Sequence, residues 1–229
     1  MKRSVLSSIL RGVTFVLLSL AALFTLLGGI GTTCVAFAAE NWESMAALVP
    51  VKPVFQVLVV ISIAAAVYGI LAIVRLGKSK PAAYRDVLIF LVVGLVTSTI
   101  QYYFSLTLRG KTAPNNVRLY VTVLALIVFL LLRLPPAWKA SGFGQNSSGK
   151  PSVSGPTGMA LLLCGLVTLT TPLWAAPTHL LNGENTVSVL LPHLLAGGIA
   201  LILAGCWTLF ARRKDSRLAE RGARLLASK

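Results

Sequence analysis

The chain has 229 residues, of which 56% are hydrophobic and only 12% are charged, against about 25% charged residues in ordinary soluble domains. This composition excludes an ordinary soluble domain and is typical of an integral membrane protein. The net charge of +15 does not indicate nucleic-acid binding, because the cations cluster at the ends of apolar runs, as topology signals do.

The first apolar region follows a basic start that contains Lys2, Arg3 and Arg11. It is long enough to cross a bilayer and longer than the apolar region of a usual signal peptide. We therefore expect an uncleaved first span over residues 12–38. The alternative is a signal peptide that is cleaved after Ala38, because Ala36 and Ala38 resemble the small residues of such a cleavage site.

Three further apolar runs complete a first membrane segment, residues 1–140. The predicted spans are residues 53–74, 87–108 and 119–134. The apolar part of the last span, Leu119 to Leu132, covers only about 21 Å of a ~30 Å hydrocarbon core. We expect Arg118 and Arg133 to extend outward from its ends, and Pro135-Pro136 to end the helix.

A Gly-, Ser- and Pro-rich stretch over residues 141–157 is predicted to be a flexible linker. A two-helix hairpin follows over residues 158–211, with spans at residues 158–176 and 187–211. The basic tail, residues 212–229, either continues the last helix, lies on anionic lipid or is solvated. The predicted fold class is thus an all-α integral membrane protein with six transmembrane helices, four before the linker and two after it.

The positive charges favour one orientation of these spans. With an inside N-terminus, most Lys and Arg residues lie on the cytoplasmic side, and only Lys52, Arg109, Lys111 and Arg118 lie outside. This asymmetry predicts cytoplasmic N- and C-termini. We expect a multi-pass protein of the plasma (inner) membrane, with the lipid bilayer as its main partner.

Small residues on several spans could form contact faces between helices or with another membrane protein, including a second copy of the chain. Alternatively, they only reflect how common Ala and Gly are in membrane helices. The candidate positions are Ala196, Ala200 and Ala204 beside Gly197 and Gly205, Ala65 with Gly69, and Gly28, Gly29 and Gly31.

A polar stripe marks the third span and is the first candidate site. Spacings of three and four residues place its members on one helix face, which leads to Arg109. With Gln56 of the second span they could line a ligand-binding cavity that opens outward; the alternative is hydrogen bonding between helices. The candidate residues are Gln56, Ser98, Gln101, Tyr102, Ser105 and Arg109.

The second candidate site comprises His179, Glu184 and His193, which fall at one membrane face and could bind a divalent metal or haem. Their spacing matches no metal motif, so interfacial histidines without a ligand are the competing interpretation. No other motif indicates a cofactor, and we expect none.

The sequence leaves three classes of function open. The first is a non-enzymatic accessory, assembly or sensory membrane component, which the absence of charge within the predicted spans favours. The second is a carrier or channel for a small neutral solute, which uses the outward-facing polar cavity. The third is a metal- or haem-dependent membrane enzyme that uses His179 and His193. We expect no enzyme, because no catalytic motif stands in a usable context.

Overall fold

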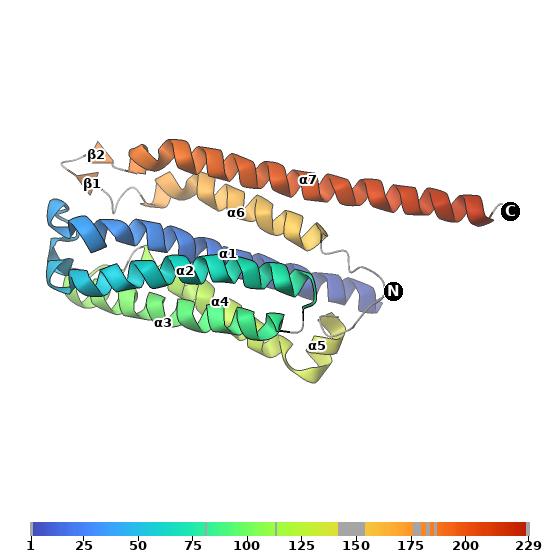
Figure 1. Cartoon of the computed structure of the whole chain (residues 1–229), viewed down its shortest axis with the longest axis horizontal. Helices are drawn as coiled ribbons and strands as arrows, with labels where there is room; N and C mark the ends of the chain where they lie inside the picture. Colours follow the sequence, from blue (N-terminus) through green and yellow to red (C-terminus); the bar gives the residue numbers. More distant parts are fainter. Residues whose placement is uncertain are drawn as a thin grey trace.

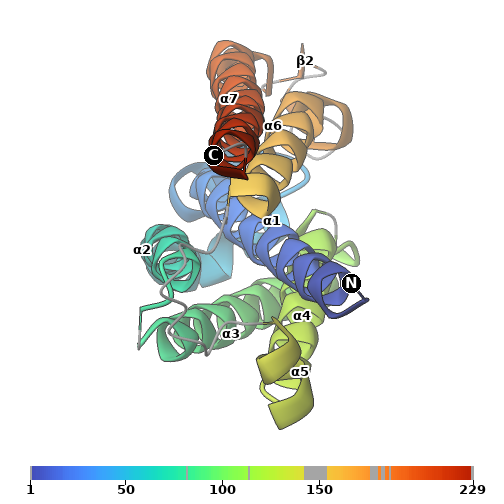
Figure 2. The ribbon, with the colours of Figure 1, turned by 90° about the vertical axis from the view of Figure 1, so that its right-hand side faces the viewer.

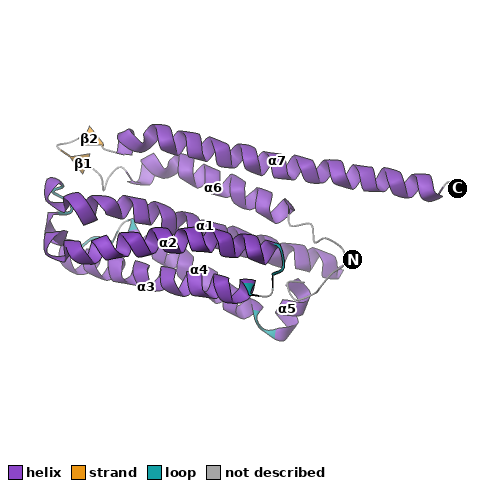
Figure 3. Ribbon diagram, viewed as in Figure 1, coloured by secondary structure: helices purple, strands orange, loops and turns teal. Residues whose placement is uncertain are grey.

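The computed structural model describes residues 2–227 except 81, 113, 142–153, 176–179, 182, 183 and 186. Helices make up nearly all of this described part, as Figure 3 shows. Six of them are long and apolar enough to cross a membrane, which confirms the expectation of six apolar helices and indicates a membrane protein. The orientation of the termini stays a prediction.

The first four membrane-length helices are α1 (Lys2–Ala38), α2 (Lys52–Gly77), α3 (Ala83–Arg109) and α4 (Asn115–Leu132). Local sequence explains their ends. Pro53 stands in the first turn of α2, where its missing N–H costs no hydrogen bond. Gly110 ends α3 with a φ of +64°, a left-handed conformation that glycine adopts without strain.

Two 3-10 turns, η1 (Ala39–Asn41) and η2 (Ala46–Val51), connect α1 to α2. A short helix, α5 (Pro135–Ser141), follows α4, so the Pro135-Pro136 pair begins a new helix as well as ending the previous one. Helix α6 (Ser154–Ala175) begins inside the stretch that was expected to be a linker. The strands β1 (Leu180–Leu181) and β2 (Glu184–Asn185) form an antiparallel pair that the sequence did not predict.

Helix α7 (Val187–Ala227) continues through the basic tail without a break, the first of the three alternatives for that segment. In Figure 1, α7 extends beyond the other helices, and both termini lie at the same end of the molecule. We call this the terminal end. The opposite end, which carries η1, η2 and the β1–β2 pair, is called the hairpin end.

Helix α1 is the central element of the fold. It packs against α2 and α4 on one side and against α6 on the other, and α7 packs on α6 (Figure 2). Helices α1 to α4 form a bundle with two apolar clusters. One cluster lies toward the terminal end around Leu18, Phe90 and Phe129, and the other lies at the hairpin end around Trp42, Leu48 and Phe55.

Helices α6 and α7 approach each other closely through glycines. A Cβ on Gly165 would lie 2.8 Å from the carbonyl oxygen of Gly198, and one on Gly205 would lie 2.9 Å from the carbonyl oxygen of Gly158. Side chains at these positions would therefore force the helices apart. Of the candidate positions on α7, Gly205 lies in this contact, whereas the side chains of Ala196, Ala200 and Ala204 are exposed.

Candidate functional site: a buried arginine inside the α1–α4 bundle

The most unusual side chain in the interior is Arg118, in the first turn of α4. It is only 2% exposed and is the largest of the fully buried side chains. The expectation that Arg118 extends outward is wrong. Helix α4 begins three residues before Arg118 and spans about 27 Å, so it needs no outward extension, and the side chain turns into the bundle.

The guanidinium of Arg118 binds side chains of two neighbouring helices. Nη1 donates to Oε1 of Gln101 over 2.9 Å, and Nη2 donates to Oγ1 of Thr97 over 2.7 Å. Nη2 also donates to Oγ of Ser62 on α2, over 3.2 Å. Thr97 lies about 18 Å from the Arg109 end of α3, which places the guanidinium deep inside the bundle.

Helix α1 makes room for this side chain by carrying glycine at position 28. A Cβ on Gly28 would lie 3.0 Å from Cδ of Arg118, closer than ordinary van der Waals contact. Thr25, one turn earlier on α1, is completely buried. All four helices of the bundle therefore contribute to one polar cluster, which we call the Arg118 cluster: Thr25, Gly28, Ser62, Thr97, Gln101, Arg118 and Thr122.

The hydrogen bonding of the Arg118 cluster is incomplete. Three buried polar atoms have no partner: Nε of Arg118, Nε2 of Gln101 and Oγ1 of Thr25. The first two are donors only. Leaving buried donors unsatisfied costs about 1–3 kcal/mol each, and such groups are rare in folded proteins.

The charge of Arg118 is not compensated by the carboxylates that the structure describes. The ion pairs between described residues join Glu40 to Lys52 and Asp86 to Arg75 and Arg85. None of them includes Arg118. An ionised side chain inside a membrane bundle is costly and generally marks a functional position.

Three members of the predicted polar stripe lie in the interior, as their spacing required. Gln101 binds Arg118, while Ser98 is buried and donates to the carbonyl oxygen of Leu95. Ser105 is buried and accepts a hydrogen bond from Nδ2 of Asn115, over 3.0 Å. Tyr102 is half-buried beside them.

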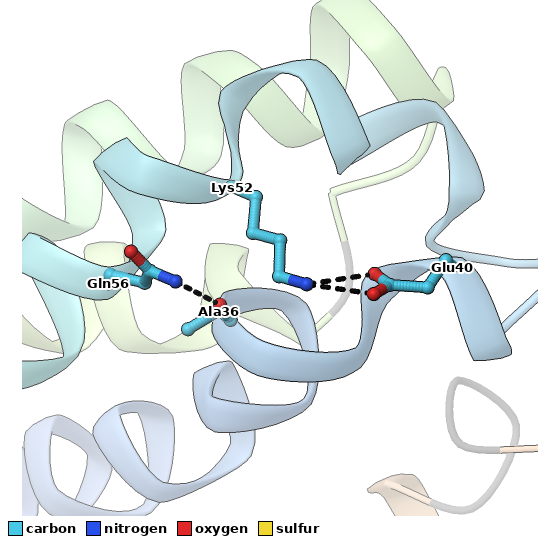
Figure 4. Close-up of polar contacts among 4 residues, drawn as sticks. All are labelled: Ala36, Glu40, Lys52 and Gln56. Atoms are coloured by element: carbon cyan, nitrogen blue, oxygen red, sulfur yellow. Dashed lines mark hydrogen bonds and ion pairs between the residues drawn. The ribbon is translucent and has the colours of Figure 1, made fainter.

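The other two members, Gln56 and Arg109, form hydrogen bonds at the hairpin end and not with the Arg118 cluster. Nε2 of Gln56 donates to the carbonyl oxygen of Ala36 over 3.0 Å, next to the Lys52–Glu40 ion pair (Figure 4). Nε of Arg109 donates to the carbonyl oxygen of Ser44 over 2.7 Å. The first contact joins α2 to the last turn of α1, and the second joins α3 to the connection between α1 and α2.

The second candidate site is not assembled by the described residues. His179 lies outside them, Glu184 is in β2, and His193 is exposed on α7. Within the described ranges, no three His, Cys, Asp or Glu residues are grouped closely enough to hold a metal ion. The metal site at His179, Glu184 and His193 therefore stays a prediction.

Arg118, Ser62 and Thr25 were not among the site residues predicted from the sequence. A usable signal was present in the polar stripe, because Gln101 and Thr97 in an apolar helix require partners from another helix. Arg118 stands at the start of an otherwise apolar helix, and glycine at position 28 offers space opposite it. Comparison of the chain with protein-family models, curated proteins and solved structures finds no match.

Proposed function

We propose that the protein is a multi-pass carrier that binds a small solute at the Arg118 cluster. The observation that supports this proposal is a set of unpartnered donors, on Arg118 and Gln101, enclosed by four membrane-length helices. A purely structural polar contact would be expected to satisfy its own donors. Carriers commonly bind their substrates deep in the bilayer, at the junction of several helices.

The proposed setting is the plasma membrane, with both termini in the cytoplasm. In this orientation the hairpin end faces outward, and the solute reaches the cluster along α3. Ser105 and Asn115 lie between Gln101 and the hairpin end and provide polar side chains on this route. Gln56 and Arg109 keep the surrounding connection in place.

Uptake by reconstituted vesicles tests the proposal. Purified protein is incorporated into vesicles, and uptake of labelled glycerol, urea, chloride and formate is measured against protein-free vesicles. We expect uptake of at least one probe, and its loss in Gln101→Leu, which keeps the side-chain volume but removes the amide. Thr107→Ala is the matched control, because Thr107 is exposed on the same helix. Its hydroxyl donates only to carbonyl oxygens of the preceding turn of that helix.

Two results would contradict the carrier proposal. One is the absence of uptake of all four probes by the wild-type protein together with the absence of any binding of them to the purified protein. The other is equal uptake by wild type and by Gln101→Leu. Ser62→Ala provides a milder second variant, because it removes one weak acceptor from Arg118 and leaves Gln101 and Thr97 in place.

An accessory or assembly role is the second candidate, and the exposure of α7 favours it. Helix α7 is the least buried of the six candidate spans. Its main contact with another helix is the one with α6. Its small residues Ala196, Ala200 and Ala204 are exposed, which leaves this face free for the helix of another membrane protein. Co-purification of one partner at fixed stoichiometry, lost in Ala200→Leu, would support this role over the carrier.

A further inference from the structure

The two charged side chains that are buried in the described part of the structure have different partners. Asp86, 3% exposed near the terminal end, accepts hydrogen bonds from Tyr68 Oη over 3.0 Å and from Arg75 Nη1 over 2.8 Å. Its charge is therefore neutralised by the protein itself. Arg118 is equally buried but has only neutral partners, so one positive charge is left over inside the bundle.

The buried polar atoms around Arg118 that lack a hydrogen-bond partner can all act as donors. The hydroxyls of Ser62 and Thr97 and the amide oxygen of Gln101 already accept from the guanidinium. What remains is the Nε–H of Arg118 and the amide N–H groups of Gln101, which only donate, and the hydroxyl of Thr25, which can donate. A group that completes the cluster must therefore accept hydrogen bonds.

The space beside Thr25 limits the size of such a group. A Cβ added to Gly94 would lie 3.8 Å from Oγ1 of Thr25 and 3.5 Å from Cγ2 of Thr122, both ordinary contact distances. The bundle thus has room for about one methyl group next to the unpartnered hydroxyl. A monatomic halide is about as large as a methyl group, whereas formate needs a little more room and a sugar or an amino acid requires the helices to separate.

We propose that the solute bound at the Arg118 cluster is a small monovalent anion, either a halide or a carboxylate such as formate. This inference rests on the proposed carrier function and specifies its substrate class. One negative charge cancels the single charge of Arg118, whereas a divalent anion would leave an uncompensated negative charge in the bundle. The earlier expectation of a neutral solute depended on spans without internal charge, a condition that Arg118 removes.

Anion-dependent thermal stability of the purified full-length protein tests this proposal. The unfolding midpoint is measured in detergent while sodium chloride or sodium formate replaces sodium gluconate, whose anion is too large for the cluster, at constant ionic strength. We expect a saturable rise of the midpoint with chloride, formate or both, because a ligand that binds only the folded state stabilises it. The two salts distinguish a halide from a carboxylate site. Sodium sulfate and glycerol should produce no saturable rise, because their general stabilising effect increases with concentration without saturating.

Three variants test whether the anion that raises the unfolding midpoint binds at the Arg118 cluster. Arg118→Met should abolish the rise, because it removes the charge that the anion would neutralise, and its midpoint in gluconate shows whether the variant is folded. Thr25→Val should weaken the apparent anion affinity about tenfold, the value of one hydrogen bond to a charged partner. Thr32→Val is the matched control on the same helix, because the Thr32 hydroxyl is occupied by the carbonyl oxygen of Gly28.

The outcomes separate the anion inference from the carrier proposal. Stabilisation or uptake with glycerol or urea, but not with chloride or formate, overturns the anion inference and leaves the carrier proposal standing. No effect of any solute on either stability or uptake overturns both. A chloride or formate effect that persists in Arg118→Met shows binding elsewhere and overturns the inference. If Arg118→Met does not fold, an unchanged anion affinity in Thr25→Val overturns it instead.

Discussion

At the scale of single residues, the Arg118 cluster depends on a position that carries no side chain. Gly28 lies against the aliphatic part of Arg118, and any Cβ at this position comes within 3.0 Å of Cδ. Three residues later on the same helix, Gly31 has nothing within 4 Å of its would-be Cβ. These two glycines therefore provide an internal comparison between a filled and an open environment.

Replacing Gly28 by leucine should displace the Arg118 side chain and destabilise the protein by about 1–3 kcal/mol, the usual cost of overpacking an interior. Gly31→Leu should not destabilise the protein, because nothing lies within 4 Å of its Cβ position and leucine has the higher helix propensity. Because both variants gain the same helix propensity, the difference between their unfolding midpoints in detergent isolates the contact with Arg118. Equal midpoints would show that Arg118 does not lie against α1.

At the scale of helices, the apolar runs predicted which segments form the membrane-length elements, because length and hydropathy are local properties of the chain. The direction of a side chain at a helix end is not local. Arg118 stands at the edge of an apolar run, where both snorkelling and inward burial satisfy the sequence pattern. Only the positions of Gly28, Ser62 and Gln101 on three other helices decide between these arrangements.

The contact face of α7 shows the same limit. The sequence offers Ala196, Ala200 and Ala204 at regular spacing, yet α6 packs on the neighbouring face with Gly198 and Gly205. The reason is that α6 has its own glycines, Gly158 and Gly165, which are separated by the same number of residues as Gly198 and Gly205. A contact between helices is a property of two surfaces, and the pattern of one helix does not identify it.

This packing predicts opposite results for two adjacent glycines of α7. Gly198→Val should destabilise the α6–α7 hairpin by about 1–3 kcal/mol, because its Cβ would come within 2.6 Å of the Leu169 side chain and 3.1 Å of the carbonyl oxygen of Gly165. Gly197→Val should be nearly neutral, since nothing lies within 4 Å of its Cβ position. Thermal unfolding in detergent compares the two, and a larger loss for Gly197→Val would contradict this arrangement of α6 and α7.

At the scale of the whole molecule, the direction of access to the Arg118 cluster depends on how the bundle sits in the membrane. The two ends of the bundle differ in charge. The terminal end carries Arg75 in the last turn of α2, Lys78 and Lys80 in the connection, and Arg85 in the first turn of α3. The hairpin end carries Glu40 and Glu43 as well as its few cations. The positive-inside rule therefore favours a cytoplasmic terminal end, and this places the proposed entry route at the outer surface.

Cysteine labelling of intact cells tests this orientation. In a background where Cys34, Cys164 and Cys206 are replaced by serine, a membrane-impermeant thiol reagent should label Glu43→Cys, because Glu43 is exposed at the hairpin end. Lys78→Cys, exposed at the terminal end, should be labelled only after the cells are permeabilised. The reverse labelling pattern would show that the protein has the opposite orientation in the membrane. Entry along Ser105 and Asn115 would then begin in the cytoplasm, and the carrier would be loaded from inside the cell.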